Sequence, residues 1–374
     1  MALSRIANTL IILIATVIIL VYGKSLMIPF ILALLVWFLT KEARSALRKI
    51  PLVASKFPVW LQSLLAGGLI FSILGGIVRI VTRNIQTLSK SWQTYEGNIE
   101  QMITQVTDRF DLDLESILND FLGNFEFSPF FRDMLSSLTD VFGNAFIIVL
   151  YALFLTLEET GFSKKLKAMY PAKDTYDEII EIIEKIDQSI GAYLSIKSLV
   201  SLLTGFLSFI ALWAIGIEAP VFWAFLIFLL NYIPTIGSLI ATAFPALFAL
   251  LQFGEFTPCL LVLVIVGAIQ IIVGNIIEPR LMGDSLNISA LVVLLALSFW
   301  GALWGVAGML MSVPITVIII IVFAEFPSTR PVAILLSDSG NVGQEEALPA
   351  EQEIIPTPDP EVAEEDPQPE SPDT

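Results

Sequence analysis

The sequence predicts an all-α polytopic membrane protein with about eight transmembrane helices, some broken or re-entrant, and a helical extramembrane loop between spans three and four. Hydrophobic residues make up 56% of the 374 residues and the mean hydropathy is +0.81. A soluble domain is far less apolar. Several apolar runs also approach or exceed the ~20 residues that cross a bilayer. The lipid bilayer is therefore the first predicted partner.

The apolar runs divide the chain into spans, loops and a tail. The runs cover residues 6–22, 26–39, 59–82, 141–157, 195–216, 219–251, 258–277 and 288–324. This pattern predicts three spans within 1–83, an extracytoplasmic helical loop at 84–140, five further spans within 141–336 with a cytoplasmic helical loop at 158–195, and a tail at 337–374. The first run has the length of a signal peptide, but no small-residue cleavage site follows, which favours a retained span.

Loop charges predict the orientation. The 41–58 loop has five basic residues against one glutamate, and the 158–197 loop contains six lysines. By contrast, residues 84–140 contain ten acidic and three basic residues. The positive-inside rule then places both lysine-rich loops and both termini in the cytoplasm. We expect a multi-pass protein of the bacterial inner membrane.

The net charge of −16 is concentrated near the end of the chain. From Glu325 onward there are thirteen acidic residues against one arginine, Arg330. The tail at 337–374 is rich in Pro and Glu and has few large apolar groups, so it is predicted to be disordered. A role as a binding tail is an alternative. No basic face for nucleic acid is evident.

Apolar residues at helical spacing occur in both long loops. In the outer loop they are Ile85, Leu88, Trp92, Tyr95, Ile99, Met102, Val106 and Phe110; in the 158–195 loop they are Tyr176, Ile179, Ile180, Ile183, Ile186 and Ile190. Each set predicts one amphipathic helix. The outer loop is either a helical hairpin that packs on itself or an interfacial lid that covers a transport path. The helix of the 158–195 loop lies on the membrane or against a neighbouring helix.

Residue inventory argues against an enzyme. The chain has no histidine and a single cysteine, Cys259. Triad chemistry and zinc sites built on histidine are therefore unavailable. No phosphate-binding loop occurs, because neither "GGI" nor "GNIIEPRLMG" ends in the required Lys-Ser/Thr pair. We expect no cofactor and no metal site.

The stretch 231–238, "NYIPTIGS", interrupts an apolar run with polar groups and helix breakers. The candidate substrate-path residues here are Asn231, Tyr232, Pro234, Thr235, Gly237 and Ser238. Because proline donates no hydrogen bond, the carbonyl one turn earlier is expected to lose its helix partner. Opened backbone at membrane depth is tolerated only where it is buried in protein or lines a wet cavity. The alternative is a kink that serves helix packing alone.

Two further stretches resemble this break. One combines Gly301, Gly305 and Gly308 with Pro314, and such paired breaks are typical of transporter binding sites. The other is a polar cluster at the end of an apolar run, with the candidates Gln270, Asn275, Glu278, Pro279 and Arg280, followed by Asp284. Glu278 and Arg280 flank a proline and are expected on opposite sides of a break; a salt bridge that anchors a helix end is the alternative.

The topology around this cluster has two solutions. If 219–251 crosses the membrane, the cluster faces outward. If 219–251 dips in and returns, the cluster is cytoplasmic and 288–324 has to be a re-entrant hairpin as well. The sequence leaves both solutions open.

These motifs resemble the autoinducer-2 exporter family, also known as the PerM-type permeases. The family pattern contains a "Y-I-P-x-I-G" break, an "N-x-x-x-P-x-x-x-G" stretch and a "W-G-x-x-x-G-x-x-G-M-x-x-x-x-P" ending. This sequence matches them at Tyr232–Gly237, Asn275–Gly283 and Trp300–Pro314. The resemblance covers about residues 5–337. Ala290 departs from it, because the family often has proline there.

The resemblance implies a secondary, non-ATP transporter that exports a small polar solute such as autoinducer-2, and homo-oligomers are described in the family. A Na⁺(Li⁺)/H⁺ antiporter is the alternative within the family. No Asp or Glu lies deep inside a predicted span, which favours solute export. A membrane scaffold or regulator, with the tail as its partner-binding element, is the alternative outside transport.

Overall fold

In the computed structural model, every element among the described residues is a helix. The structure describes residues 2–48, 145–283 and 287–341, and separate residues between 62 and 101. The α-helices are α1 (Ala2–Tyr22), α2 (Lys24–Arg48), α8 (Ala145–Met169), α9 (Lys173–Ile215), α10 (Pro220–Leu230), α11 (Ile236–Phe253), α12 (Phe256–Ile272), α13 (Glu278–Met282), α14 (Ala290–Glu325) and α15 (Arg330–Leu336); a π-helix, η1 (Val273–Ile277), joins α12 to α13.

The helices agree with a polytopic membrane protein. Five are long and apolar enough to cross a membrane, and the number rises to six if the bent pair within α8 is one span. The count of about eight stays a prediction. The predicted third span at 59–82, the loop at 84–140 and most of the tail at 337–374 lie outside the described residues, apart from separate positions.

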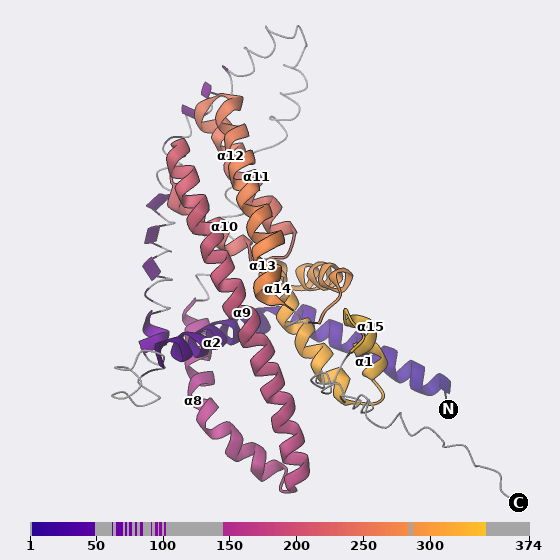
Figure 1. The fold of residues 1–374 in the computed structure, drawn as a ribbon. Coiled ribbons are helices and arrows are strands. Elements are labelled where there is room, and N and C mark those ends of the chain that lie inside the picture. The colour runs from indigo at the N-terminus through magenta and orange to yellow at the C-terminus, as the bar shows by residue number, and fades with distance from the viewer. Residues whose placement is uncertain are drawn as a thin grey trace, which may run out of the picture.

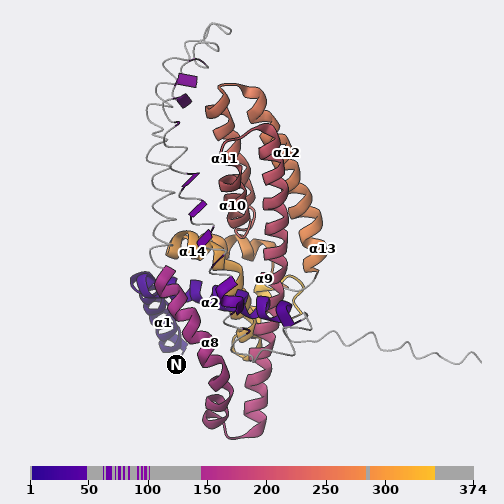
Figure 2. The same cartoon turned by 90° about the vertical axis from the view of Figure 1, so that its left-hand side faces the viewer.

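Helix α9 is the longest element and runs along most of the molecule in both views (Figures 1 and 2). Its 43 residues unite the predicted fifth span with the helix expected in the 158–195 loop. The helix predicted from Tyr176 to Ile190 is present, and it continues without a break into the predicted fifth span. Helices α10 to α12 lie beside one half of α9, and α8 returns beside the other (Figure 2).

The segment 219–251 is a helical hairpin. Its two helices, α10 and α11, have 11 and 18 residues and pack on each other. Gln252, at the end of α11, donates from Nε2 to the Gly216 carbonyl before α10 (2.9 Å) and accepts from the Glu218 amide through Oε1 (2.8 Å). Both ends of this hairpin therefore lie together, at the C-terminal end of α9.

Packing of large side chains holds the α10–α11 hairpin against its neighbours. Phe222, Trp223, Leu226 and Ile227 of α10 are each at most 5% exposed and share one core with Phe248 of α11 and Val262 and Val266 of α12. Burying apolar area in this way stabilises the short helix α10 against its longer neighbours.

Helix α14 is a second hairpin. At Gly305 the backbone leaves the helical region, with φ 59° and ψ −138°. Val293 before this break and Val313 after it pack into one cluster with Ile186 and Ile190. The two arms thus lie together at the N-terminal half of α9, so the two hairpins approach α9 from opposite ends. This arrangement favours the solution in which both 219–251 and 288–324 are re-entrant.

Cysteine labelling tests the first hairpin. We expect Val221→Cys and Glu255→Cys, both at exposed positions, to react from the same side of the membrane, and Lys173→Cys from the opposite side. The background is Cys259→Ala, which removes the single native cysteine. An impermeant thiol reagent on intact cells should label positions 221 and 255 but not 173. Labelling of 221 without 255 would instead indicate that the segment crosses.

Candidate functional site

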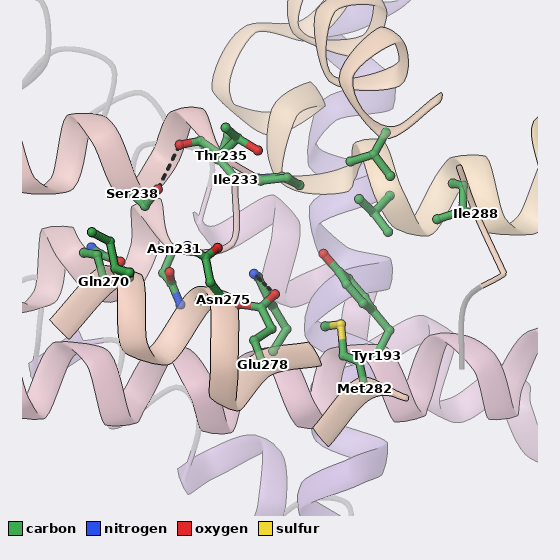
Figure 3. Close-up of a pocket in the computed structure, with 16 residues that line it drawn as sticks. Tyr193, Asn231, Ile233, Thr235, Ser238, Gln270, Asn275, Glu278, Met282 and Ile288 are labelled. Carbon is green, nitrogen blue, oxygen red and sulfur yellow. Dashed lines mark hydrogen bonds and ion pairs between the residues drawn. The ribbon is translucent and has the colours of Figure 1, made fainter. Parts of the chain in front are cut away.

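The two hairpins, α9 and the η1 region enclose a cavity of about 450 Å³. This is within the range of small-molecule sites. Figure 3 shows the polar side chains of Asn231, Asn275 and Glu278 together in this cavity, with Tyr193 on its other side. The full lining is Tyr193, Lys197, Asn231, Ile233, Pro234, Thr235, Ser238, Gln270, Ile271, Gly274, Asn275, Glu278, Met282, Ile288, Val293 and Val313.

The tip of the α10–α11 hairpin is a strained turn. Thr235 has φ 59° and ψ −60°, and the Ile236 amide donates to the Pro234 carbonyl at 2.6 Å. This is a γ-turn of the rare type with positive φ, which is costly for a β-branched residue. Ser238 Oγ donates to the Thr235 carbonyl at 2.9 Å (Figure 3). The turn presents Thr235 and Ser238 to the cavity.

The carbonyl expected to be free before Pro234 has a partner. That carbonyl belongs to Leu230, and it accepts from the Ile233 amide at 2.9 Å. The expectation fails because the chain tightens into a short turn before the proline instead of continuing as a helix. The polar character of this tip therefore comes from its side chains and not from an unpaired backbone carbonyl.

Hydrogen bonds to α9 hold the tip in place. Asn231 is 7% exposed, and its Nδ2 donates to Ser201 Oγ at 3.1 Å. The Tyr232 hydroxyl lies 2.7 Å from Ser198 Oγ. Ser198 and Ser201 are neighbours along one face of α9, so both bonds hold the tip to that face.

The η1 segment shapes the opposite wall. The Glu278 amide donates to the Val273 carbonyl five residues earlier, as a π-helix requires. Pro279 cannot donate to the carbonyl of Asn275, one turn before it. Such π-helical turns are frequent at functional sites. Here the turn places Gly274, Asn275 and Glu278 on the cavity wall.

A buried ion pair lies inside the cavity. Lys197 Nζ on α9 contacts Glu278 Oε1, and the two side chains are 6% and 16% exposed. They are the two charged groups among the lining residues, so the lining has no net charge. Removing one partner of a buried pair leaves an uncompensated charge, which is strongly unfavourable. The pair therefore joins α9 to α13.

Gln270 provides a buried donor without an acceptor. It is 7% exposed and lines the cavity, and its Nε2 has no hydrogen-bond partner among the described residues. A buried unsatisfied amide costs about 1–3 kcal/mol. A solute oxygen in the cavity would satisfy it.

The structure brings together most of the predicted site residues. Those that line the cavity are Asn231, Pro234, Thr235, Ser238, Gln270, Asn275 and Glu278. Four others are outside the lining. Tyr232 instead bonds α9, Gly237 is packed against Leu230, and Pro279 and Arg280 are on the exposed side of α13. Glu278 lines the cavity and Arg280 is exposed, and both belong to the same short helix, α13. The expectation that a break separates them is therefore wrong.

Tyr193 and Lys197 are the two polar residues of the cavity lining that the sequence did not single out. Lys197 was counted as a charge of the cytoplasmic loop. It lies instead within α9, on a buried polar face with Ser201, Thr204 and Ser208 at helical spacing. That spacing, in an otherwise apolar helix, was the signal available in the sequence.

Long apolar helices and two helical hairpins around a cavity with a buried ion pair are features of a polytopic membrane protein of transporter type. The chain belongs to the AI-2E transporter family: the family model described as AI-2E family transporter matches residues 10–328.

Relatives extend over nearly the same length. The chain is 35% identical over 337 residues to a Haemophilus influenzae protein provisionally named a transport protein, covering 87% of this chain and 95% of the relative. It is 31% identical over 319 residues to the AI-2 transport protein TqsA of Escherichia coli, covering 85% and 91%. A third relative, the Escherichia coli protein YhhT, is 42% identical over 129 residues, 34% of this chain and 37% of the relative.

Proposed function

We propose that this protein is a secondary transporter that exports a small polar solute, which binds in the cavity between the α10–α11 hairpin and η1. One observation carries the proposal: the cavity contains the buried Lys197–Glu278 pair, and its wall includes Gln270, a buried side chain whose Nε2 has no hydrogen-bond partner among the described residues. Unsatisfied and paired polar groups around one space at membrane depth are the features of a ligand site.

Autoinducer-2 is the first solute to test, because one relative is named an AI-2 transport protein. The direct experiment measures its flux in proteoliposomes containing the purified protein. Flux with no imposed gradient, with a Na⁺ gradient and with a proton gradient separates uncoupled from coupled transport. Efflux that equals that of empty liposomes under all three conditions would reject autoinducer-2 as the solute.

A Na⁺(Li⁺)/H⁺ antiporter is the second candidate. The Glu278 carboxylate supports it, because this group lines the cavity and is the more exposed member of its ion pair. The same proteoliposomes test it through the collapse of an imposed proton gradient on addition of Na⁺ or Li⁺. Gradient collapse without any solute would favour the antiporter.

Gln270→Leu separates a solute contact from a structural role. We expect its melting temperature to equal or exceed that of the wild type. Leucine is similar in size to glutamine and has no polar group that needs a hydrogen-bond partner. We expect its solute flux per folded molecule to fall at least about tenfold, the effect of losing one 1.4 kcal/mol contact. Melting temperature and flux are measured on the same preparation.

Ser208→Ala is the matched control. Ser208 is fully buried on α9 with an unpartnered Oγ among the described residues, but it does not line the cavity. The Ser208→Ala variant should be more stable than the wild type, because it too loses an unsatisfied polar group, and its solute flux should equal that of the wild type. Wild-type flux in Gln270→Leu would remove Gln270 from the site.

A further inference from the structure

The Lys197–Glu278 pair raises the question of what charge the cavity can accept. Each group is the other's compensating charge, and the lining carries no third charged residue. A lone anion or cation entering this space would leave one unit of net charge buried, at a cost of several kcal/mol. The intact pair therefore disfavours the entry of either ion alone.

An acid that binds as an anion together with a proton avoids this cost. The anion takes the place of the Glu278 carboxylate at the Lys197 ammonium, and the proton neutralises Glu278. The cavity has no net charge before the exchange and none after it. A cation at Glu278 would be balanced in the same way only if Lys197, which is 6% exposed and has no second carboxylate among the lining residues, released its proton.

The groups around the pair suit an anionic oxygen better than a cation. The Lys197 ammonium has three donors, one of which contacts Glu278. The titratable groups near Glu278 are Lys197 and Tyr193, both on α9. Tyr232, on the hairpin tip, is hydrogen-bonded to Ser198 of α9. The α14 residues that line the cavity, Val293 and Val313, do not titrate.

We infer that the cavity is a proton-coupled anion site, in which a small organic acid binds Lys197 as its anion while Glu278 takes up one proton. This inference rests on the proposed function only in treating the cavity as the solute site, and it names the solute class as ionised small acids. It assigns Lys197 to the anion and Glu278 to the proton.

Calorimetry on the detergent-purified protein tests the stoichiometry. Acetate, lactate and benzoate are the probes, and acetamide, lactamide and benzamide are their uncharged counterparts. Titration in two buffers with different ionisation enthalpies gives the number of protons taken up per bound molecule. For at least one acid we expect one proton per anion, and an affinity that rises about tenfold per pH unit as the pH falls through the range in which the acid stays ionised.

Variants assign the charges. Glu278→Gln mimics the protonated glutamate and is expected to bind the same acid without proton uptake and without pH dependence. The double variant Lys197→Gln/Glu278→Gln keeps the cavity neutral but offers neither an ammonium nor a proton acceptor, so it is expected to bind the ionised acid more weakly than its amide. It also avoids the buried unpaired carboxylate that Lys197→Gln alone would leave.

Three results would overturn the inference: binding of the acid by the wild type with no proton uptake, failure of Glu278→Gln to bind any of the three acids, or equal binding of acid and amide by the wild type. Flux of the bound acid in proteoliposomes is a separate measurement. Binding with proton uptake but without flux would refute the proposed transport function and leave the anion site intact.

Discussion

Replacing Lys197 by glutamine is expected to lower the free energy of unfolding by about 3–5 kcal/mol, the cost of breaking a buried ion pair. The reason is that Glu278, 16% exposed, is left without its partner in a space that has no other cation among the lining residues. A large fall in melting temperature in detergent, followed through tryptophan fluorescence, is the measurement.

Two controls isolate the ion pair. The double variant Lys197→Gln/Glu278→Gln removes both charges and should recover most of the lost stability. Lys185→Gln breaks the exposed contact with Glu325, which joins groups 44% and 32% exposed at 3.3 Å. That change should cost no more than about 1 kcal/mol. If Lys197→Gln and the double variant have the same melting temperature, Lys197 and Glu278 do not stabilise each other.

Gly237→Ala is expected to disrupt the α10–α11 hairpin and abolish transport. A Cβ at this position would lie 1.8 Å from the Leu230 carbonyl oxygen, a distance at which backbone has to move. Overpacking in well-packed sites costs about 1–3 kcal/mol, and more where the obstacle is backbone. Melting temperature and flux should therefore fall together, because the same movement displaces Thr235 and Ser238 from the cavity.

Gly267→Ala provides the matched control within the neighbouring helix α12. Its added methyl group would meet the Thr242 side chain at 3.8 Å, an ordinary contact, and alanine raises helix propensity by about 1 kcal/mol over glycine. This variant should be as stable as the wild type or more so. A wild-type melting temperature in Gly237→Ala would mean that the two arms do not meet at the tip.

The polar interruptions could be predicted from the sequence because their residue types are rare in apolar segments. Asn231, Thr235, Asn275 and Glu278 all lie on the cavity. Whether the chain crosses or returns could not be predicted, because an uncharged run has the same composition in both cases. The bonds from Gln252 to Gly216 and Glu218 show that the segment folds back, and they join residues far apart in sequence.

Lys197 could not be assigned from loop charge alone. A lysine next to a predicted span is most often a solvated anchor at the membrane surface. Its pairing with Glu278 depends on how α9 packs against α13, which local sequence does not contain. The polar face that continues to Ser201 and Ser208 carries the relevant information.

The unbroken length of α9 has a mechanical consequence. Lys185 and Lys197 are about 18 Å apart along one helix, at 1.5 Å per residue, with no joint between them. The first contacts Glu325 near the end of α14, and the second contacts Glu278 inside the cavity. A tilt of α9 at the Lys185 end would therefore displace Lys197 relative to Glu278 in the cavity. Conversely, a ligand that moves Lys197 would displace Lys185 relative to Glu325.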